Sequence, residues 1–248
     1  MARKFTQFFS LDSTKAIKAR DYGYMNAINY MAPADLAGVG DICPWRTTAC
    51  SALCLGWFSG QAGMVKGNAK RPLNSVRKSR IAKTRMFMRD RATFMNELNQ
   101  GIAQAWRKAD RDGLKLCIRL NGASDIAWEG IKDTFGRNTF DKWPTLQFID
   151  YTKSKRRALA HARGELPRNY HLTFSRSESN EADCLEVLAA GGNVAVVFAG
   201  EKPKAWNGFR VINGDKHDLR HLDPKGVVVG LSPKGPRAKR DKSGFVVR

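Results

Sequence analysis

Short apolar runs alternate with helical segments over the second half of the chain, and this alternation constrains the fold more than any other feature. The runs cover residues 114–120, 146–151, 170–175, 193–198, 209–213 and 226–231. Between the first four of them stand candidate helices at 124–135, 153–163 and 179–190. Strands rich in β-branched residues and separated by helices are typical of parallel β/α units. We therefore expect an α/β fold in which about six strands form a partial or complete parallel β/α barrel, with an open doubly wound sheet as the alternative.

The length of the chain suits one large domain. Its 248 residues can bury a sizeable core. We expect a single α/β domain over residues 1–232 and an extended basic tail over residues 233–248. No stretch approaches the roughly 18 consecutive apolar residues of a membrane span, and the N-terminus lacks the apolar region of a secretory signal. The sequence thus predicts a cytoplasmic protein without a membrane partner.

Three of the five cysteines, Cys43, Cys50 and Cys54, fall within residues 41–63. Six residues separate the first pair and three the second. The shorter gap places Cys50 and Cys54 on one face of a helical turn, and Pro44 with nearby glycines favours a loop that brings Cys43 close. Small residues in this stretch leave room for a bulky inorganic group.

The spacing of the cysteines indicates which kind of metal site this loop could form. Zinc usually takes four ligands and often uses two-residue spacings, whereas three local cysteines can hold a four-iron cluster and leave one iron open. The stretch also lacks histidine. We therefore expect a 4Fe-4S cluster with Cys43, Cys50 and Cys54 as ligands, and zinc or metal-free core cysteines are the alternatives. Cys117 is expected in the core, and Cys184, in the helix after the third strand, is expected too far from the loop to be a fourth ligand.

The net charge of +20, from 43 basic and 23 acidic residues, favours a polyanionic partner. Nucleic acid fits this charge, DNA in preference to RNA, and attraction to an anionic membrane surface or simple solubility are the alternatives. Apolar residues at Ile81, Met88, Ala92, Met95, Ile102 and Trp106 predict one long helix over residues 74–110. The candidate nucleic-acid-binding residues are Lys66, Lys70, Arg71, Arg77, Lys78, Arg85, Arg89, Lys239 and Arg240.

Polar residues stand where the expected strands end. In β/α folds, functional residues collect at the loops that follow the strands. Asp125 follows the first run, Asp150 ends the second, and Asp215 and His217 follow the fifth. If these side chains converge, they could bind a cation or transfer protons. They are the candidate catalytic residues.

Several distinctive segments follow one another along the chain. They are "CPWRTTACSALCLGWFSGQAG", "NSVRKSRIAKTRMF", "IRLNGASDIAWEG", "DYTKS", "NYHLTFSRSESN" and "GDKHDLRHLDPKGVVVGL". In this order they resemble the phage and plasmid gene product 88 family. The resemblance implies a protein of mobile-element origin that acts in the host cytoplasm.

The cysteine loop followed by β/α units is also similar to radical S-adenosylmethionine enzymes, in which three cysteines hold a four-iron cluster and one iron binds the cofactor. Those enzymes space the cysteines by three and two residues, after the first barrel strand. Here the gaps are six and three, and the loop precedes a long basic helix. S-adenosylmethionine is an expected cofactor on this resemblance alone.

Three hypotheses follow from the sequence. The leading one is a phage-type iron-sulfur protein that binds nucleic acid and, if it is an enzyme, modifies or cleaves it. The second is a non-catalytic protein that binds single-stranded nucleic acid and uses the cluster as a structural element. The third is a radical S-adenosylmethionine-like enzyme with a small-molecule substrate.

Overall fold

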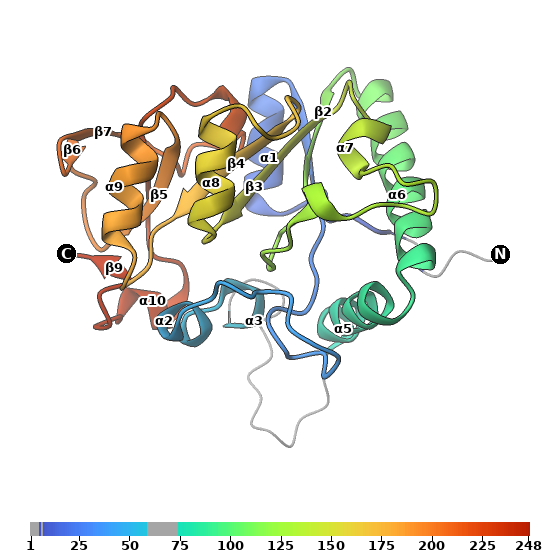
Figure 1. The fold of residues 1–248 in the computed structure, drawn as a ribbon, viewed down its shortest axis with the longest axis horizontal. Coiled ribbons are helices and arrows are strands. Elements are labelled where there is room, and N and C mark those ends of the chain that lie inside the picture. The colour runs from blue at the N-terminus through green and yellow to red at the C-terminus, as the bar shows by residue number, and fades with distance from the viewer. Residues whose placement is uncertain (1–4, 6, 59–73) are drawn as a thin grey trace.

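A nine-stranded, mostly parallel sheet organises the described part of the chain. The computed structural model describes residues 5, 7–58 and 74–248 (Figure 1). The strands are β1 (Tyr24–Ile28), β2 (Lys115–Arg119), β3 (Gln147–Thr152), β4 (Tyr170–Ser175), β5 (Asn193–Phe198), β6 (Ala205–Trp206), β7 (Phe209–Asn213), β8 (Val228–Leu231) and β9 (Val246–Val247). Their order is β1-β2-β3-β4-β5-β8-β7-β6, and β9 pairs with β5. The β6–β7 hairpin is antiparallel and the other pairings between these strands are parallel.

The α/β class is confirmed, but the sheet is open. β1 stands at one edge and the two-residue β6 at the other, so the expectation of a complete barrel is wrong. The doubly wound alternative does not fit either, because strands β1 to β5 follow one another in chain order without the reversal that defines such a sheet. All six predicted runs form strands, whereas β1, β6 and β9 were not predicted.

The predicted long basic helix is two helices, α5 (Ser75–Arg89) and α6 (Arg91–Arg111). Asp90 leaves the helical region with φ −141° and ψ 72°, and its side chain accepts a hydrogen bond from the Thr93 amide as the N-cap of α6. The predicted apolar face is wrong in part. Met95 and Ile102 are buried, but Met88 and Trp106 are exposed. The break at Asp90 separates Met88 of α5 from the buried face of α6, whereas Trp106 lies on α6 itself.

The remaining helices are short. They are α1 (Thr14–Lys18), α2 (Thr48–Ala52), α3 (Leu55–Phe58), α7 (Thr139–Lys142), α8 (Lys155–Ala162), α9 (Glu181–Ala189) and α10 (Gly235–Lys239). The predicted helix at 124–135 is wrong, since only Trp128–Gly130 form a 3-10 turn there. Asn121 holds this segment as a loop, because its Oδ1 accepts hydrogen bonds from the Ile126 amide and the Trp128 indole at 3.0 and 3.1 Å.

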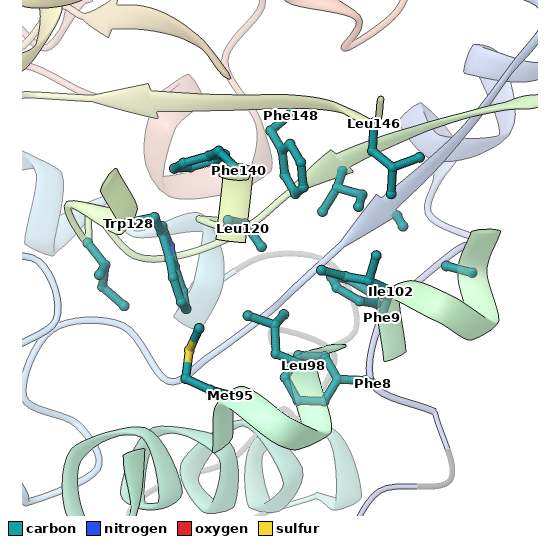
Figure 2. Close-up of a cluster of buried hydrophobic side chains, with 14 of the residues drawn as sticks. Phe8, Phe9, Met95, Leu98, Ile102, Leu120, Trp128, Phe140, Leu146 and Phe148 are labelled. Carbon is teal, nitrogen blue, oxygen red and sulfur yellow. The ribbon is translucent and has the colours of Figure 1, made fainter. Parts of the chain in front are cut away.

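Two hydrophobic clusters cover one face of the sheet. In the first, Leu98 and Ile102 of α6 pack with Leu120, which follows β2, and with Phe148 near the start of β3 (Figure 2). In the second, α8 and α9 pack on β4, β5 and β8, with Cys184 fully buried in α9. The other face carries a smaller cluster that contains Cys117. Cys117 is therefore a core residue, as predicted, and Cys184 is one as well.

The last sixteen residues, 233–248, belong to the folded structure rather than forming the expected extended tail. They contain α10, and β9 pairs with the last residues of β5, beyond the point where β4 ends. Arg176 donates hydrogen bonds to the carbonyl oxygens of Gly244 and Phe245 at 2.7 and 3.2 Å. In the part of the chain that the structure describes, no helix is long and apolar enough to cross a membrane.

Candidate functional site

The cysteine loop lies at the edge of the sheet where the parallel strands end. The chain leaves β1 beside the end of β2, where the Asn29 amide donates to the Arg119 carbonyl at 2.8 Å. Further on, the Asp125 amide donates to the Ile42 carbonyl at 2.9 Å and so joins this loop to the segment after β2. Figure 1 shows α2 and α3 below the sheet, between α10 and α5. The loop thus follows the first strand of the sheet, which the sequence analysis did not foresee.

Cys43 is tied to the backbone on both sides. Its Sγ accepts a hydrogen bond from the Ala34 amide at 3.3 Å and donates to the Ala123 carbonyl at 3.7 Å. Burial, with smaller contributions from the nearby thiols of Cys54 and Cys50, raises the pKa of the Cys43 thiol to about 12, although the hydrogen bond from the Ala34 amide lowers it. Without a metal, this sulfur stays protonated at neutral pH.

Cys50 and Cys54 are placed by two short helices. Thr47 caps α2 by accepting a hydrogen bond from the Cys50 amide at 3.2 Å. Cys54 precedes α3, and burial raises the pKa of its thiol while the amides of Gly56 and Trp57, which point at its sulfur, lower it. Backbone amides directed at a sulfur stabilise negative charge on it.

Each pair among Cys43, Cys50 and Cys54 is close enough to interact electrostatically. The structure therefore brings the three predicted ligands together on one loop. Within residues 5, 7–58 and 74–248, no three Cys, His, Asp or Glu groups are arranged so that they could hold a metal ion directly. Binding a metal would require the thiols to turn toward a common centre.

Arginines from three distant helices stack on the aromatic rings of the cysteine loop. Such cation–π contacts with partly buried rings each add of the order of 1 kcal/mol. The stacked pairs, with the distance from guanidinium carbon to ring centroid, are Arg157 on Trp45 (5.7 Å), Arg77 on Trp57 (4.3 Å) and Arg237 on Phe58 (3.6 Å). We call these three pairs the arginine clamp. The clamp therefore connects the cysteine loop to α8, α5 and α10.

Glu178, in the loop after β4, holds the start of α2. Its carboxylate accepts hydrogen bonds from the Thr47 hydroxyl at 2.8 Å and the Ala49 amide at 3.0 Å. These contacts lower the pKa of Glu178 although burial opposes them. The cysteine loop is therefore anchored to a fourth element of the fold.

A cavity of about 1280 Å³ opens beside the cysteine loop. Its walls come from the ends of β1 and β2, from α3, from α5 and from the starts of α1 and α10. The charged residues in its lining are Lys18, Arg80, Lys83, Arg119 and Lys234 against Asp12, Asp215 and Asp218. Cations therefore exceed carboxylates in the described lining.

The candidate catalytic carboxylates Asp125 and Asp150 belong to one buried network. Asp125 accepts hydrogen bonds from Arg157 at 2.9 Å and from the Lys153 amide at 2.7 Å. Asp150 accepts from the Asn121 amide at 2.6 Å and from the Tyr170 hydroxyl at 3.0 Å. Burial raises the pKa of Asp150 to about 7, against the hydrogen bond from Asn121, which lowers it. Neither carboxylate is among the described lining of the cavity.

Asp215 and His217 lie in the turn after β7, in surroundings different from those of Asp125 and Asp150. Asp215 forms an ion pair with Lys202 at 3.0 Å and accepts from the Ser232 amide. His217 packs edge-on against Tyr22 and accepts from the Leu219 amide at 3.2 Å. Of the four candidate catalytic residues, only Asp215 is among the described residues that line the cavity.

The candidate nucleic-acid-binding residues divide into three groups. Lys78, Arg85 and Arg89 are exposed on α5, and Lys239 and Arg240 are exposed at the end of α10. Arg77 instead belongs to the arginine clamp and also donates to the Trp57 carbonyl at 3.0 Å. Lys66, Lys70 and Arg71 lie outside the described residues.

A family model described as Gene product 88 matches residues 6–248. The chain belongs to the Gene product 88 family. This membership confirms the resemblance that the ordered segments indicated. No curated protein and no solved structure matches the chain.

Several residues that build the site in this member of the Gene product 88 family were missed by sequence reasoning. Lys83 is buried, and Arg80 lies beside it in the cavity lining, within the basic stretch that was read as a surface. Their three-residue spacing on one helix face was a usable signal. Glu178, Arg157 and Arg237 contact the loop from far along the chain, and no local pattern indicates such contacts.

Proposed function

We propose that Cys43, Cys50 and Cys54 hold a 4Fe-4S cluster at the edge of the sheet, and that the basic surface around them binds nucleic acid, DNA in preference to RNA. The observation that carries the proposal is the convergence of three thiols on one anchored loop. Four separate elements hold this loop through the arginine clamp and Glu178. Cysteines that only filled a core would not need contacts from four separate elements.

The surroundings of the thiols suit an iron-sulfur cluster. Amides point at the sulfurs of Cys43 and Cys54, and hydrogen bonds of this kind stabilise cluster thiolates. The other two cysteines are buried in separate parts of the core. Only three protein thiolates are therefore available in this arrangement, and one iron of such a cluster would lack a cysteine ligand.

The charge around the loop supports a nucleic-acid partner. The helices α5 and α10, which carry exposed cations, flank α2 and α3 on the same side of the molecule (Figure 1). The two helices lie on this side together although they are about 150 residues apart in the sequence. A surface of this kind binds polyanions by releasing their counterions.

Metal analysis of an anaerobic preparation tests the cluster. We expect a brown protein that contains iron and acid-labile sulfide. Cys50→Ala should lose the iron, while Cys184→Ala, a matched change at a buried cysteine in α9, should keep it. Iron that persists in Cys50→Ala, or a colourless and iron-free wild-type protein, would contradict the ligand assignment.

Salt dependence tests nucleic-acid binding. For a single-stranded DNA oligonucleotide, the logarithm of the association constant should fall linearly with the logarithm of the salt concentration. Replacing Lys78, Arg85 and Arg89 together with Gln should reduce this slope by about 2, since each lost phosphate contact accounts for ~0.7. Arg107→Gln, an exposed change on α6, is the matched control. Binding that ignores salt would exclude this part of the proposal.

A second candidate function is a radical S-adenosylmethionine reaction. The observation that favours it is the position of the cysteine loop after β1, the strand that opens a run of parallel strands in chain order. In the radical enzymes the cysteines likewise follow the first strand. With dithionite as the reductant, the loaded protein should convert S-adenosylmethionine to methionine and 5′-deoxyadenosine. If the protein with its cluster produces neither compound, this second candidate function is excluded.

A further inference from the structure

Two cations on the inner side of α5 face the cavity. Arg80 donates to the Gly56 carbonyl at 2.7 Å and stacks on Tyr30 at 4.5 Å. Lys83 is 6% exposed, donates to the Phe8 carbonyl and lies 4.6 Å from the centroid of the Phe8 ring. Both residues line the cavity, three positions apart on one helix. Their described partners are backbone carbonyls and aromatic rings.

The carboxylates of the same cavity have other partners. Asp218 pairs with Arg119 at 2.9 Å, and Asp215 pairs with Lys202 at 3.0 Å. Burial lowers the pKa of Lys83 to about 7, and the charge of Arg80 contributes to this decrease. Among the described residues, neither the buried Lys83 nor the half-buried Arg80 has a paired carboxylate. Such cations are costly, and an anion bound between them would offset that cost.

The cavity is larger than a simple anion requires. Its volume of about 1280 Å³ is at the scale of sites for small organic ligands, well above that of one phosphate group. Tyr30 and Phe58 add aromatic surface, and Ser75 and Ser79 add hydroxyl groups near the cations. Aromatic rings suit the stacking of a nucleobase. The combination matches a ligand with one anionic end and one flat, largely apolar end.

We propose that this cavity binds a nucleotide, with its phosphate group between Arg80 and Lys83. The proposal rests on the proposed function in one respect, because it identifies which part of a nucleic acid would enter the cavity. The same phosphate chemistry has two sources, a free nucleotide and the 5′-phosphorylated end of a DNA strand. In either case the ligand lies beside the loop that carries Cys54.

Thermal unfolding of the full-length protein tests the proposal. The probes are a nucleoside 5′-monophosphate, the matching nucleoside and inorganic phosphate, at constant ionic strength. The monophosphate should raise Tm saturably and more than either of the others. Arg80→Gln and Lys83→Met should each weaken its binding by tenfold or more, while Arg107→Gln should bind as the wild type does. Because the Tm shift is measured on the wild type, the test stands even if a variant fails to fold.

Oligonucleotides distinguish the two sources. Tenfold tighter binding of a 5′-phosphorylated oligonucleotide than of its 5′-hydroxyl form indicates a strand end, and equal binding of the two forms indicates a free nucleotide. No stabilisation by the monophosphate, an equal effect of inorganic phosphate, or an equal loss in Arg107→Gln would overturn the proposal. The failure of the proposed function shows separately, in the iron content and the salt dependence of oligonucleotide binding.

Discussion

Two largely buried histidines should make the stability of the protein depend on pH. His161 and His171 pack edge to face with ring centroids 4.7 Å apart. Burial, together with the neighbouring positive groups, lowers the pKa of His171 to about 3 and that of His161 to about 4. Both rings are therefore neutral in the folded protein over most of the acidic range.

His171 should make the protein less stable as the pH drops below 6.5. Between pH 6.5 and about 3, the unfolded chain holds a proton on His171 that the folded chain does not, so acid favours unfolding. We expect this residue to account for about 1–2 kcal/mol of the free energy of unfolding lost between pH 7 and pH 5. Urea unfolding of the wild type and His171→Asn at both pH values measures it. An equal loss in the variant would contradict the assignment.

Lys83 should produce a pH dependence at alkaline pH. Its pKa is about 7 in the folded protein, chiefly because of burial, against 10.5 ordinarily, so between these values the unfolded chain binds more protons. Stability therefore rises from pH 7 to pH 9, by about 2 kcal/mol for this group. Lys83→Met should lack the rise, and Lys142→Met, at a partly buried surface position, should keep it. Urea titrations at the two pH values make the comparison.

Secondary-structure elements could be predicted where the local pattern of side chains determines the structure. The strands rich in β-branched residues were found, because local pattern and burial agree in them. β1 was missed because Asn26 interrupts its apolar residues, although that side chain is fully buried. The break between α5 and α6 was missed because the apolar spacing continues across Asp90. The backbone conformation of Asp90 cannot be inferred from this spacing.

Asp90 should contribute measurably to the stability of α6. Its side chain accepts from the Thr93 amide at 3.1 Å, and the loss of such a cap costs about 1 kcal/mol. Asp90→Ala should therefore lower the free energy of unfolding by this amount in a urea titration. Asp110→Ala, at the other end of the helix, should be neutral or slightly stabilising, because an acid there opposes the helix dipole. The reverse ranking would show that the cap contributes little.

The architecture of the protein depends on contacts between segments that are distant in the sequence. The sequence predicted that three cysteines share a loop, since that is a matter of spacing. It favoured a barrel and gave an open sheet as the alternative, because the choice depends on the short strand β6 and on the pairing of β7 with β8. It also did not predict the arginine clamp, whose members come from residues 45 to 237.

The C-terminal segment should be required for full stability. Val246 is buried, Phe245 lies under Lys153 at 5.3 Å, and β9 pairs with β5. Removing residues 244–248 should cost about 2 kcal/mol, the scale of one fully buried apolar side chain. Thermal unfolding measures the loss, and the full-length Arg248→Gln protein separates the effect of charge from that of the strand. A truncated protein as stable as the full chain would show that β9 is dispensable.

The arginine clamp sets an order of events during synthesis of the protein. The cysteines occupy residues 43 to 54, whereas Arg237 stands 183 residues after Cys54. At about 5–20 residues per second, roughly ten seconds or more separate their synthesis. The cysteine loop therefore gains its contact with Arg237 well after its own residues have been made. A cofactor that binds in this loop would meet the complete clamp only after that delay.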